Sequence, residues 1–208
     1  WSRYTGGDFP NVAVRDLVIH PRDHDLVIAT HGRGIWIIDD ITPLRALTPD
    51  TLTKAATFLQ TTPAVQRLSA SGGWANGDAE FIGRNPPDDA LITYYLQKRH
   101  IFGDMKLEVY DEAGKLVQAL PTSKRRGLSR VAWSMRLAPP RMPPAATAAF
   151  GVGPRLLPGT YTVKLTEGGQ EVTTPLRVVS DPRSVHTIED RRAQFDLSMR
   201  LYGMLNDM

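Results

Sequence analysis

The chain has 208 residues, 41% of them hydrophobic, so it can form one large or two small globular domains. It contains no cysteine, which excludes disulfides and thiolate metal sites. Lys and Arg exceed Asp and Glu by only 25 − 22 = 3, and basic residues cluster only at residues 124–126, in an expected hairpin loop. We therefore expect no nucleic-acid partner, and no apolar run approaches the ~18 residues that would cross a membrane.

Residues 8–40 are predicted to form a meander of three β-strands. Apolar, β-branched runs at 12–20, 26–30 and 35–38 are separated by short turns rich in Pro, Gly and Asp. Short turns make consecutive strands antiparallel neighbours, and Gly32 and Gly34 allow the positive φ of a tight reversal. The runs are apolar on both faces, so we expect this sheet to be covered from two sides.

The segment VRDLVIHPRDHDLVIATHGRGIWIIDD, residues 14–40, resembles the final blade of large β-propeller proteins with BNR-type and sortilin-type repeats, often called glycosyl-hydrolase-like. The Asp-box of such repeats, Ser-x-Asp-x-Gly-x-x-Trp, does not occur in it. The resemblance implies that residues 1–41 are a closing blade of an exported bacterial protein. Such a blade is incomplete alone, so its expected partners are upstream blades of the same protein, present in the same or a separate chain.

Residues 42–88 are predicted to be a connector. It contains a short helix at 51–56, for which Thr48 or Asp50 would be the cap, and a Gly- and Ser-rich loop at 69–78. We expect this connector to lead from the blade into a second body.

Residues 89–180 are predicted to form an antiparallel immunoglobulin-like β-sandwich. Strands are expected at 91–96, 105–111, 116–120 and 129–133, followed by a hairpin around Gly168 and Gly169. LITYYL, KLEVYDEAGKLVQAL, GLSRVAWSM and LPGTYTVKL resemble immunoglobulin-like domains of the flagellar-hook-cap kind, and Tyr161 and Trp133 are expected in the core. The fold class is thus mainly β, with a closing blade, a sandwich and a C-terminal helix.

Residues 181–208 are predicted to contain the start of a helical segment. Thr187 and Asp190 have the spacing of a capping box with an acidic third residue. The apolar positions expected on one amphipathic helix are Ile188, Phe195, Leu197, Met199, Leu201 and Leu205. We expect the native polypeptide to continue into a helical hairpin.

The sharpest chemical cluster in the sequence is His31, Arg33, Asp39 and Asp40. Two carboxylates and a histidine suit acid–base chemistry such as glycoside hydrolysis. However, adjacent residues of a strand point to opposite faces, so Asp39 and Asp40 would not address one bond. The favoured interpretation is structural: an aspartate caps the strand exit and pairs with Arg33.

The remaining candidate sites are weaker. His20, Asp23, His24 and Asp25 are candidate metal ligands, as are Asp78, Glu80, Asp88 and Asp89, but neither group has a recognised ligand spacing, so no metal or cofactor is expected. The aromatic candidates for ligand binding are Trp36 and Trp74. Tyr94, Tyr95 and Trp133 are further candidates, but aromatic residues in sandwich strands are more often part of the core.

Two functions stay open at this stage. In the first, this is a non-catalytic structural and binding region that braces a propeller and presents a protein- or glycan-binding surface. In the second, it is an accessory part of a sialidase- or xyloglucanase-like glycoside hydrolase, whose catalytic acids lie on upstream blades.

Overall fold

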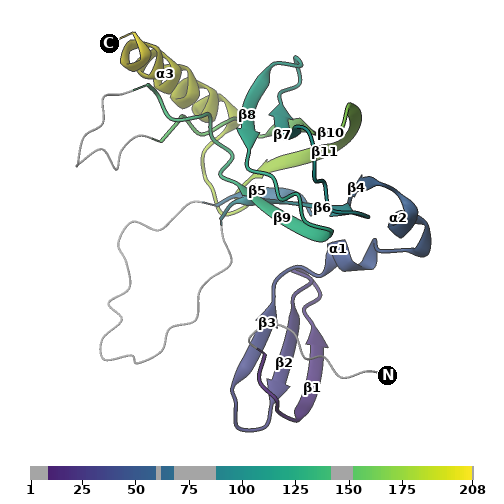
Figure 1. Ribbon diagram of the computed structural model, residues 1–208. Helices are drawn as coiled ribbons and strands as arrows, with labels where there is room; N and C mark the ends of the chain where they lie inside the picture. The colour runs from purple at the N-terminus through teal and green to yellow at the C-terminus, as the bar shows by residue number, and fades with distance from the viewer. Residues whose placement is uncertain (1–8, 60–61, 68–87, 142–151, 208) are drawn as a thin grey trace. The chain divides into compact units, whose positions relative to one another are not determined.

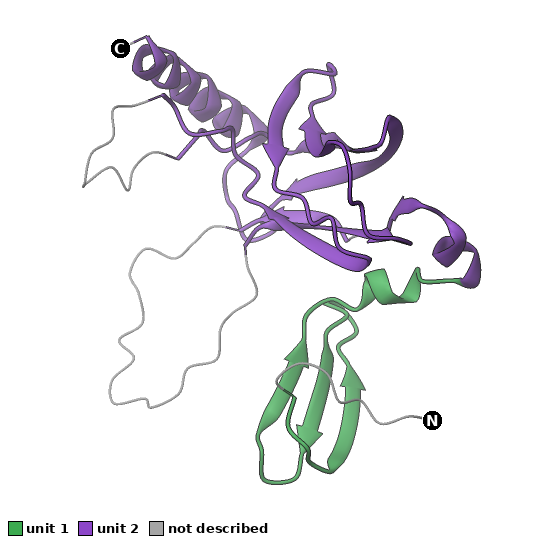
Figure 2. Cartoon of the chain, viewed as in Figure 1, with its two compact units in different colours: residues 1–48 green, residues 49–208 purple. Residues whose placement is uncertain are grey.

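A computed structural model describes residues 9–59, 62–67, 88–141 and 152–207 (Figure 1). The chain divides into two compact units, residues 1–48 and 49–208 (Figure 2). The described residues are mainly β, with three sheets and a long C-terminal helix.

The first unit is the predicted antiparallel meander. It contains β1 (Val14–Ile19), β2 (Leu26–Thr30), β3 (Ile35–Ile38) and α1 (Thr42–Arg45). The strands lie in the order β1-β2-β3, and both neighbouring pairs are antiparallel, which confirms the prediction. Gly32 and Gly34 have φ of +74° and +76°, as expected for the tight turn between β2 and β3.

Both faces of this sheet carry exposed apolar side chains. Leu17 and Val18 are adjacent on β1 and are 58% and 53% exposed, and Ile37 and Ile38 on β3 are 58% and 47% exposed. Adjacent strand residues point to opposite faces, so the exposed apolar surface lies on both of them. The expected cover on two sides is therefore not supplied by the described residues of this unit.

The second unit contains two further sheets. Its elements are α2 (Pro49–Thr53), β4 (Ala56–Phe58), β5 (Ala64–Gln66), β6 (Ala90–Leu96), β7 (Met105–Tyr110), β8 (Leu116–Leu120), β9 (Gly127–Trp133), β10 (Gly159–Glu167), β11 (Gln170–Ser180) and α3 (Ile188–Asn206). One sheet has the order β5-β11-β10-β7-β8 and the other has the order β4-β6-β9 (Figure 1). The predicted hairpin around Gly168 and Gly169 is confirmed by the nine-residue pairing of β10 with β11.

One hydrophobic core joins these two sheets, since most of its buried residues come from β6 and β9 on one side and from β7, β8, β10 and β11 on the other. Trp133 is 1% exposed and meets Tyr161 edge to face, with 5.3 Å between ring centroids. The indole Nε1 of Trp133 donates to Gln118 Oε1 at 3.2 Å, and the Tyr161 hydroxyl donates to the Leu157 carbonyl at 2.7 Å. Both aromatic residues lie in the core, as predicted, with their polar atoms hydrogen-bonded.

The second unit differs from the sequence-based expectation in three places. The strands β4 and β5 lie within the predicted connector, and β5 pairs parallel to β11, so the larger sheet is not purely antiparallel. Residues 124–126 do not lie in a hairpin loop, because β8 and β9, which flank them, belong to different sheets. The helix predicted at 51–56 is α2, which begins at Pro49, and proline is well tolerated in a first helical turn.

The predicted capping box begins α3. Thr187 Oγ1 accepts from the Asp190 amide at 3.2 Å, and Asp190 Oδ2 accepts from the Thr187 amide at 2.8 Å. Phe195 packs against the core, whereas Leu197 and Leu201 are 51% and 54% exposed. The apolar residues of the helix therefore do not share one buried face, contrary to the amphipathic prediction.

Candidate functional site

The predicted catalytic cluster is divided between the two ends of β3. His31 and Arg33 lie in the turn before the strand, and Asp39 and Asp40 follow its last residue. The four residues of β3 span about 13 Å at the usual rise per residue. The described structure therefore does not bring the histidine and the two carboxylates together at one point.

Asp40 instead organises the exit of β3. Its backbone has φ +41°, its amide donates to Asp25 Oδ1 at 2.9 Å, and its Oδ1 accepts from the Thr42 amide at 3.0 Å. The Ile41 amide also donates to the His24 carbonyl at 3.0 Å. These bonds tie the strand exit to the β1–β2 turn, which is a structural role for Asp25 and Asp40.

The candidate metal loop, His20, Asp23, His24 and Asp25, forms that same turn. His20 Nδ1 lies 3.2 Å from Asp23 Oδ2, and Arg22 Nη2 lies 2.8 Å from the same oxygen. Within the described ranges there is no group of three or more His, Cys, Asp or Glu side chains arranged to hold a metal ion.

The second candidate metal group is only partly described by the structure. Asp88 lies 4.0 Å from Arg67, while Asp78, Glu80 and Trp74 fall outside the described residues.

The aromatic ligand candidates that the structure describes have internal partners. Trp36 is half-buried, donates its Nε1 hydrogen to the Arg33 carbonyl at 3.1 Å and meets Phe9 edge to face at 5.4 Å. Tyr94, Tyr95 and Trp133 are buried, with exposures of 0%, 9% and 1%. No described member of the set forms an exposed carbohydrate platform.

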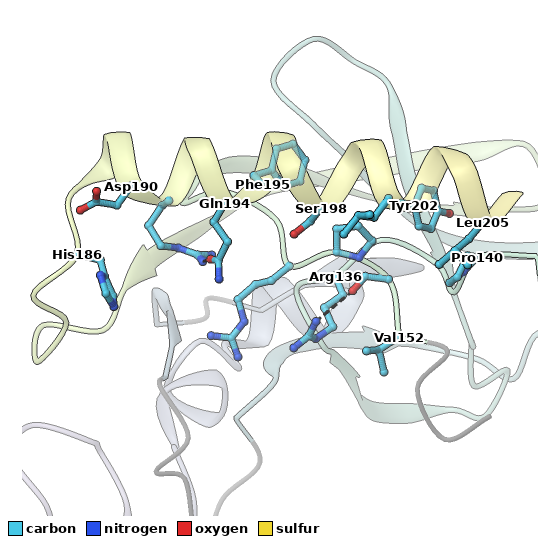
Figure 3. A pocket seen from close by; sticks show the side chains of 15 residues that line it. Arg136, Pro140, Val152, His186, Asp190, Gln194, Phe195, Ser198, Tyr202 and Leu205 are labelled. Carbon is cyan, nitrogen blue, oxygen red and sulfur yellow. Dashed lines mark hydrogen bonds between the residues drawn. The ribbon is translucent and has the colours of Figure 1, made fainter. Parts of the chain in front are cut away.

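The structure shows a pocket that the sequence did not indicate. It lies in the second unit along α3 and has a volume of about 660 Å³ (Figure 3). Gln194, Ser198 and Tyr202 line it from the helix, and Arg136 and Val152 line it from the opposite side (Figure 3). This volume lies within the range of small-molecule sites, about 300–1,000 Å³.

Three arginines, Arg136, Arg155 and Arg191, line this pocket. Arg136 and Arg155 are opposite each other in an isolated antiparallel bridge, flanked by bonds from the Leu137 amide to the Pro154 carbonyl and from the Leu156 amide to the Met135 carbonyl, both 3.0 Å. This pattern defines a non-hydrogen-bonded pair, the closer of the two antiparallel arrangements. Like charges directly opposite each other destabilise a pair of strands.

The arginines make hydrogen bonds to neutral groups. Arg136 donates to the Gly153 carbonyl at 3.1 Å, Arg155 donates to the Arg67 carbonyl at 3.1 Å, and Arg191 donates to the Gln194 side chain. None of the three forms an ion pair with a carboxylate among the residues that the structure describes.

The positive charges in this pocket also affect each other. Burial, and then the charge of Arg155, lower the pKa of Arg136. Burial, and then the charges of Arg155 and Arg136, lower the pKa of Arg191. Arginine stays charged at neutral pH despite such shifts, so three mutually repelling cations remain in the pocket.

Comparison with known proteins assigns no family. The chain matches no protein-family model, and no curated protein sequence matches it significantly. In the described part of the chain, no helix has both the length and the apolar character needed to cross a membrane.

Proposed function

We propose that residues 1–41 form the closing blade of an exported β-propeller protein and that residues 89–180, within the second unit, form an immunoglobulin-like sandwich that braces it. In this proposal the region has a structural and binding role, and it does not carry the catalytic residues of an enzyme. The observation that carries the proposal is the apolar surface on both faces of the β1-β2-β3 sheet.

Seven large apolar side chains of β1 and β3 are exposed: Val14, Leu17, Val18, Ile19, Ile35, Ile37 and Ile38. They are 43–70% exposed, and full burial of one such side chain is worth about 1.5–3 kcal/mol. Only about half of each side chain remains to be covered. Covering all seven would therefore contribute on the order of 5–10 kcal/mol, comparable to the net stability of a whole domain. A sheet stacked between two neighbouring blades would have both faces covered in this way.

The edges of the sheet support the same proposal. Among the described residues β1 and β3 each pair only with β2, so each has one open edge. Propeller blades have four strands, and ring closure by a strand from elsewhere in the propeller removes an open edge.

Two features of the second unit support an immunoglobulin-like sandwich. Two sheets share one core around the buried Trp133, and Tyr161 near the start of β10 bonds back to the carbonyl of Leu157. A tyrosine that bonds to backbone a few residues upstream is characteristic of immunoglobulin-like domains. Export and the hydrolase alternative stay predictions from the resemblance, and no described contact favours the hydrolase.

Native mass spectrometry of the protein isolated intact from its natural source tests this proposal. We expect the β1-β2-β3 sheet to be found together with further blades, in one polypeptide or in a tight complex. Leu17→Lys should expose residues 20–25 to limited proteolysis, whereas Phe102→Lys, at a residue that is 85% exposed in the second unit, should not. A monodisperse protein without further blades, whose sheet resists proteolysis in both variants, would contradict the proposal.

A further inference from the structure

We propose that the pocket along α3 binds a small organic anion. The carboxylate, sulfate or phosphate group of the ligand would lie among Arg136, Arg155 and Arg191, with its ring or apolar body against Tyr202 and Leu205. The site belongs entirely to the second unit, so it does not depend on the blade proposal.

Positive charge is concentrated in this pocket. A β-bridge places Arg136 and Arg155 side by side, and α3 adds Arg191. These three sequence-distant arginines have no carboxylate partner among the described residues, and their hydrogen bonds go to two backbone carbonyls and an amide side chain. An oxyanion between them would turn a repulsive arrangement into an attractive one.

The guanidinium groups of these arginines keep hydrogen-bond donors for a ligand. Each guanidinium has five N–H donors, and each of these arginines makes one side-chain hydrogen bond among the described residues. The remaining donors match the oxygen pairs of carboxylate, sulfate and phosphate. Asp190 also lines the pocket, but its carboxylate accepts from the Thr187 amide and hydroxyl at 2.8 and 3.0 Å.

The pocket is large and its wall is partly apolar. The pocket, at about 660 Å³, is much larger than an inorganic ion, and Phe195, Leu201, Tyr202 and Leu205 contribute apolar surface to it. A pocket with apolar walls and a few converging polar groups is the usual form of a small-molecule site. The geometry therefore favours an anion that carries a ring or alkyl body over a bare ion.

The test is calorimetric titration of the intact protein, at about 0.15 M ionic strength, with benzoate, phenyl sulfate and phenyl phosphate. Inorganic phosphate and phenol are the comparison probes, because each carries only one half of the proposed ligand. We expect at least one aryl oxyanion to bind more tightly than both comparison probes. The ranking of the three aryl compounds then identifies the preferred oxyanion.

The decisive variant is Arg136→Gln/Arg155→Gln, with Arg125→Gln/Arg177→Gln as the control. The control removes the same charge from two exposed arginines outside the pocket. A hydrogen bond to a charged group is worth about 1.5–3 kcal/mol, so losing two should weaken binding about 100-fold or more. The control should stay within about threefold of the unmodified protein, since distant exposed charges are screened.

Arg191→Gln provides a second variant if the double variant does not fold. Arg191 is on α3 and its side chain bonds only to Gln194 among the described residues, so the substitution should leave the sheets intact. It should weaken binding about tenfold or more. Equal binding in the pocket and control variants would overturn the proposal. It would also be overturned if no aryl oxyanion bound more tightly than both phenol and inorganic phosphate.

Discussion

The close approach of Gly153 to residues 137 and 138 provides a sharp test of the pocket's framework. A Cβ on Gly153 would lie 2.5 Å from the Ala138 carbonyl oxygen and closer still to that of Leu137, whereas side chains essentially never approach within 3.0 Å. The neighbouring atoms are backbone and the Leu137 oxygen is the closer one, so the two segments must separate by more than 3.0 − 2.5 = 0.5 Å. Gly153 does not have a positive φ, so the strain of Gly153→Ala is steric.

The cost follows from the contacts at this crossing. Overpacking costs about 1–3 kcal/mol, and weakening the two backbone bonds that flank the Arg136–Arg155 bridge costs about 1 kcal/mol each. We therefore expect Gly153→Ala to destabilise the second unit by about 3–5 kcal/mol. For a unit of this size that corresponds to a fall in melting temperature of roughly 6–20 °C.

Thermal unfolding followed by near-ultraviolet circular dichroism measures this effect. The matched control is Gly203→Ala, which adds the same methyl group on α3 with nothing within 4 Å of it. Alanine is favoured over glycine inside a helix by up to about 1 kcal/mol, so the control should be neutral or stabilising. An unchanged melting temperature for Gly153→Ala would refute the close crossing and the geometry of the arginine pair.

Three further predictions concern the second unit. Tyr94→Phe should lower the free energy of unfolding, measured in urea, by about 2–4 kcal/mol, because the buried hydroxyl bonds to both the amide and the carbonyl of Ser123. Equal unfolding midpoints for the variant and the unmodified protein would contradict this. Burial raises the pKa of Tyr161 to about 12. The contribution of the Tyr161 hydroxyl to stability should therefore be complete below pH 10 and lost as the pH rises through 12. Tyr161→Phe should abolish this loss of stability in alkaline unfolding. Hydrogen bonds from Thr187 lower the pKa of Asp190. The first turn of α3 should therefore be stable above pH 3.8 and fray as the pH falls through the lowered pKa. NMR amide shifts of this turn that do not change in that pH range would disprove the cap.

Local patterns predicted much of the fold. The meander was predictable because Pro, Gly and Asp separate the apolar runs. The start of α3 was predictable because Thr187 and Asp190 have the spacing of a capping box. The strands β4 and β5 were missed because three residues are too few to establish a period of two. The exposure of Leu197 and Leu201 on α3 was not predicted, because an apolar pattern does not specify how much of the helix its neighbours cover.

The arginine pocket was not predictable from local patterns. Its arginines are at positions 136, 155 and 191, and only an isolated bridge and the docking of α3 bring them together. Conversely, the most distinctive local cluster in the sequence, from His31 to Asp40, is divided by β3. Proximity along the chain therefore misled the site prediction, because an extended strand separates residues that are close in sequence.

Backbone hydrogen exchange of the intact 208-residue chain tests the central claim, that the β1-β2-β3 sheet requires covering neighbours, most directly. The account predicts that amides of β2, the central strand, exchange at least about 100-fold faster than those of β6 and β10 in the covered core, because local opening exposes little that was buried. Addition of the remaining blades should slow the exchange of β2 to the level of β10. Equal protection of β2 and β10 in the isolated monomer would contradict the account, because the sheet would then be stable without neighbours.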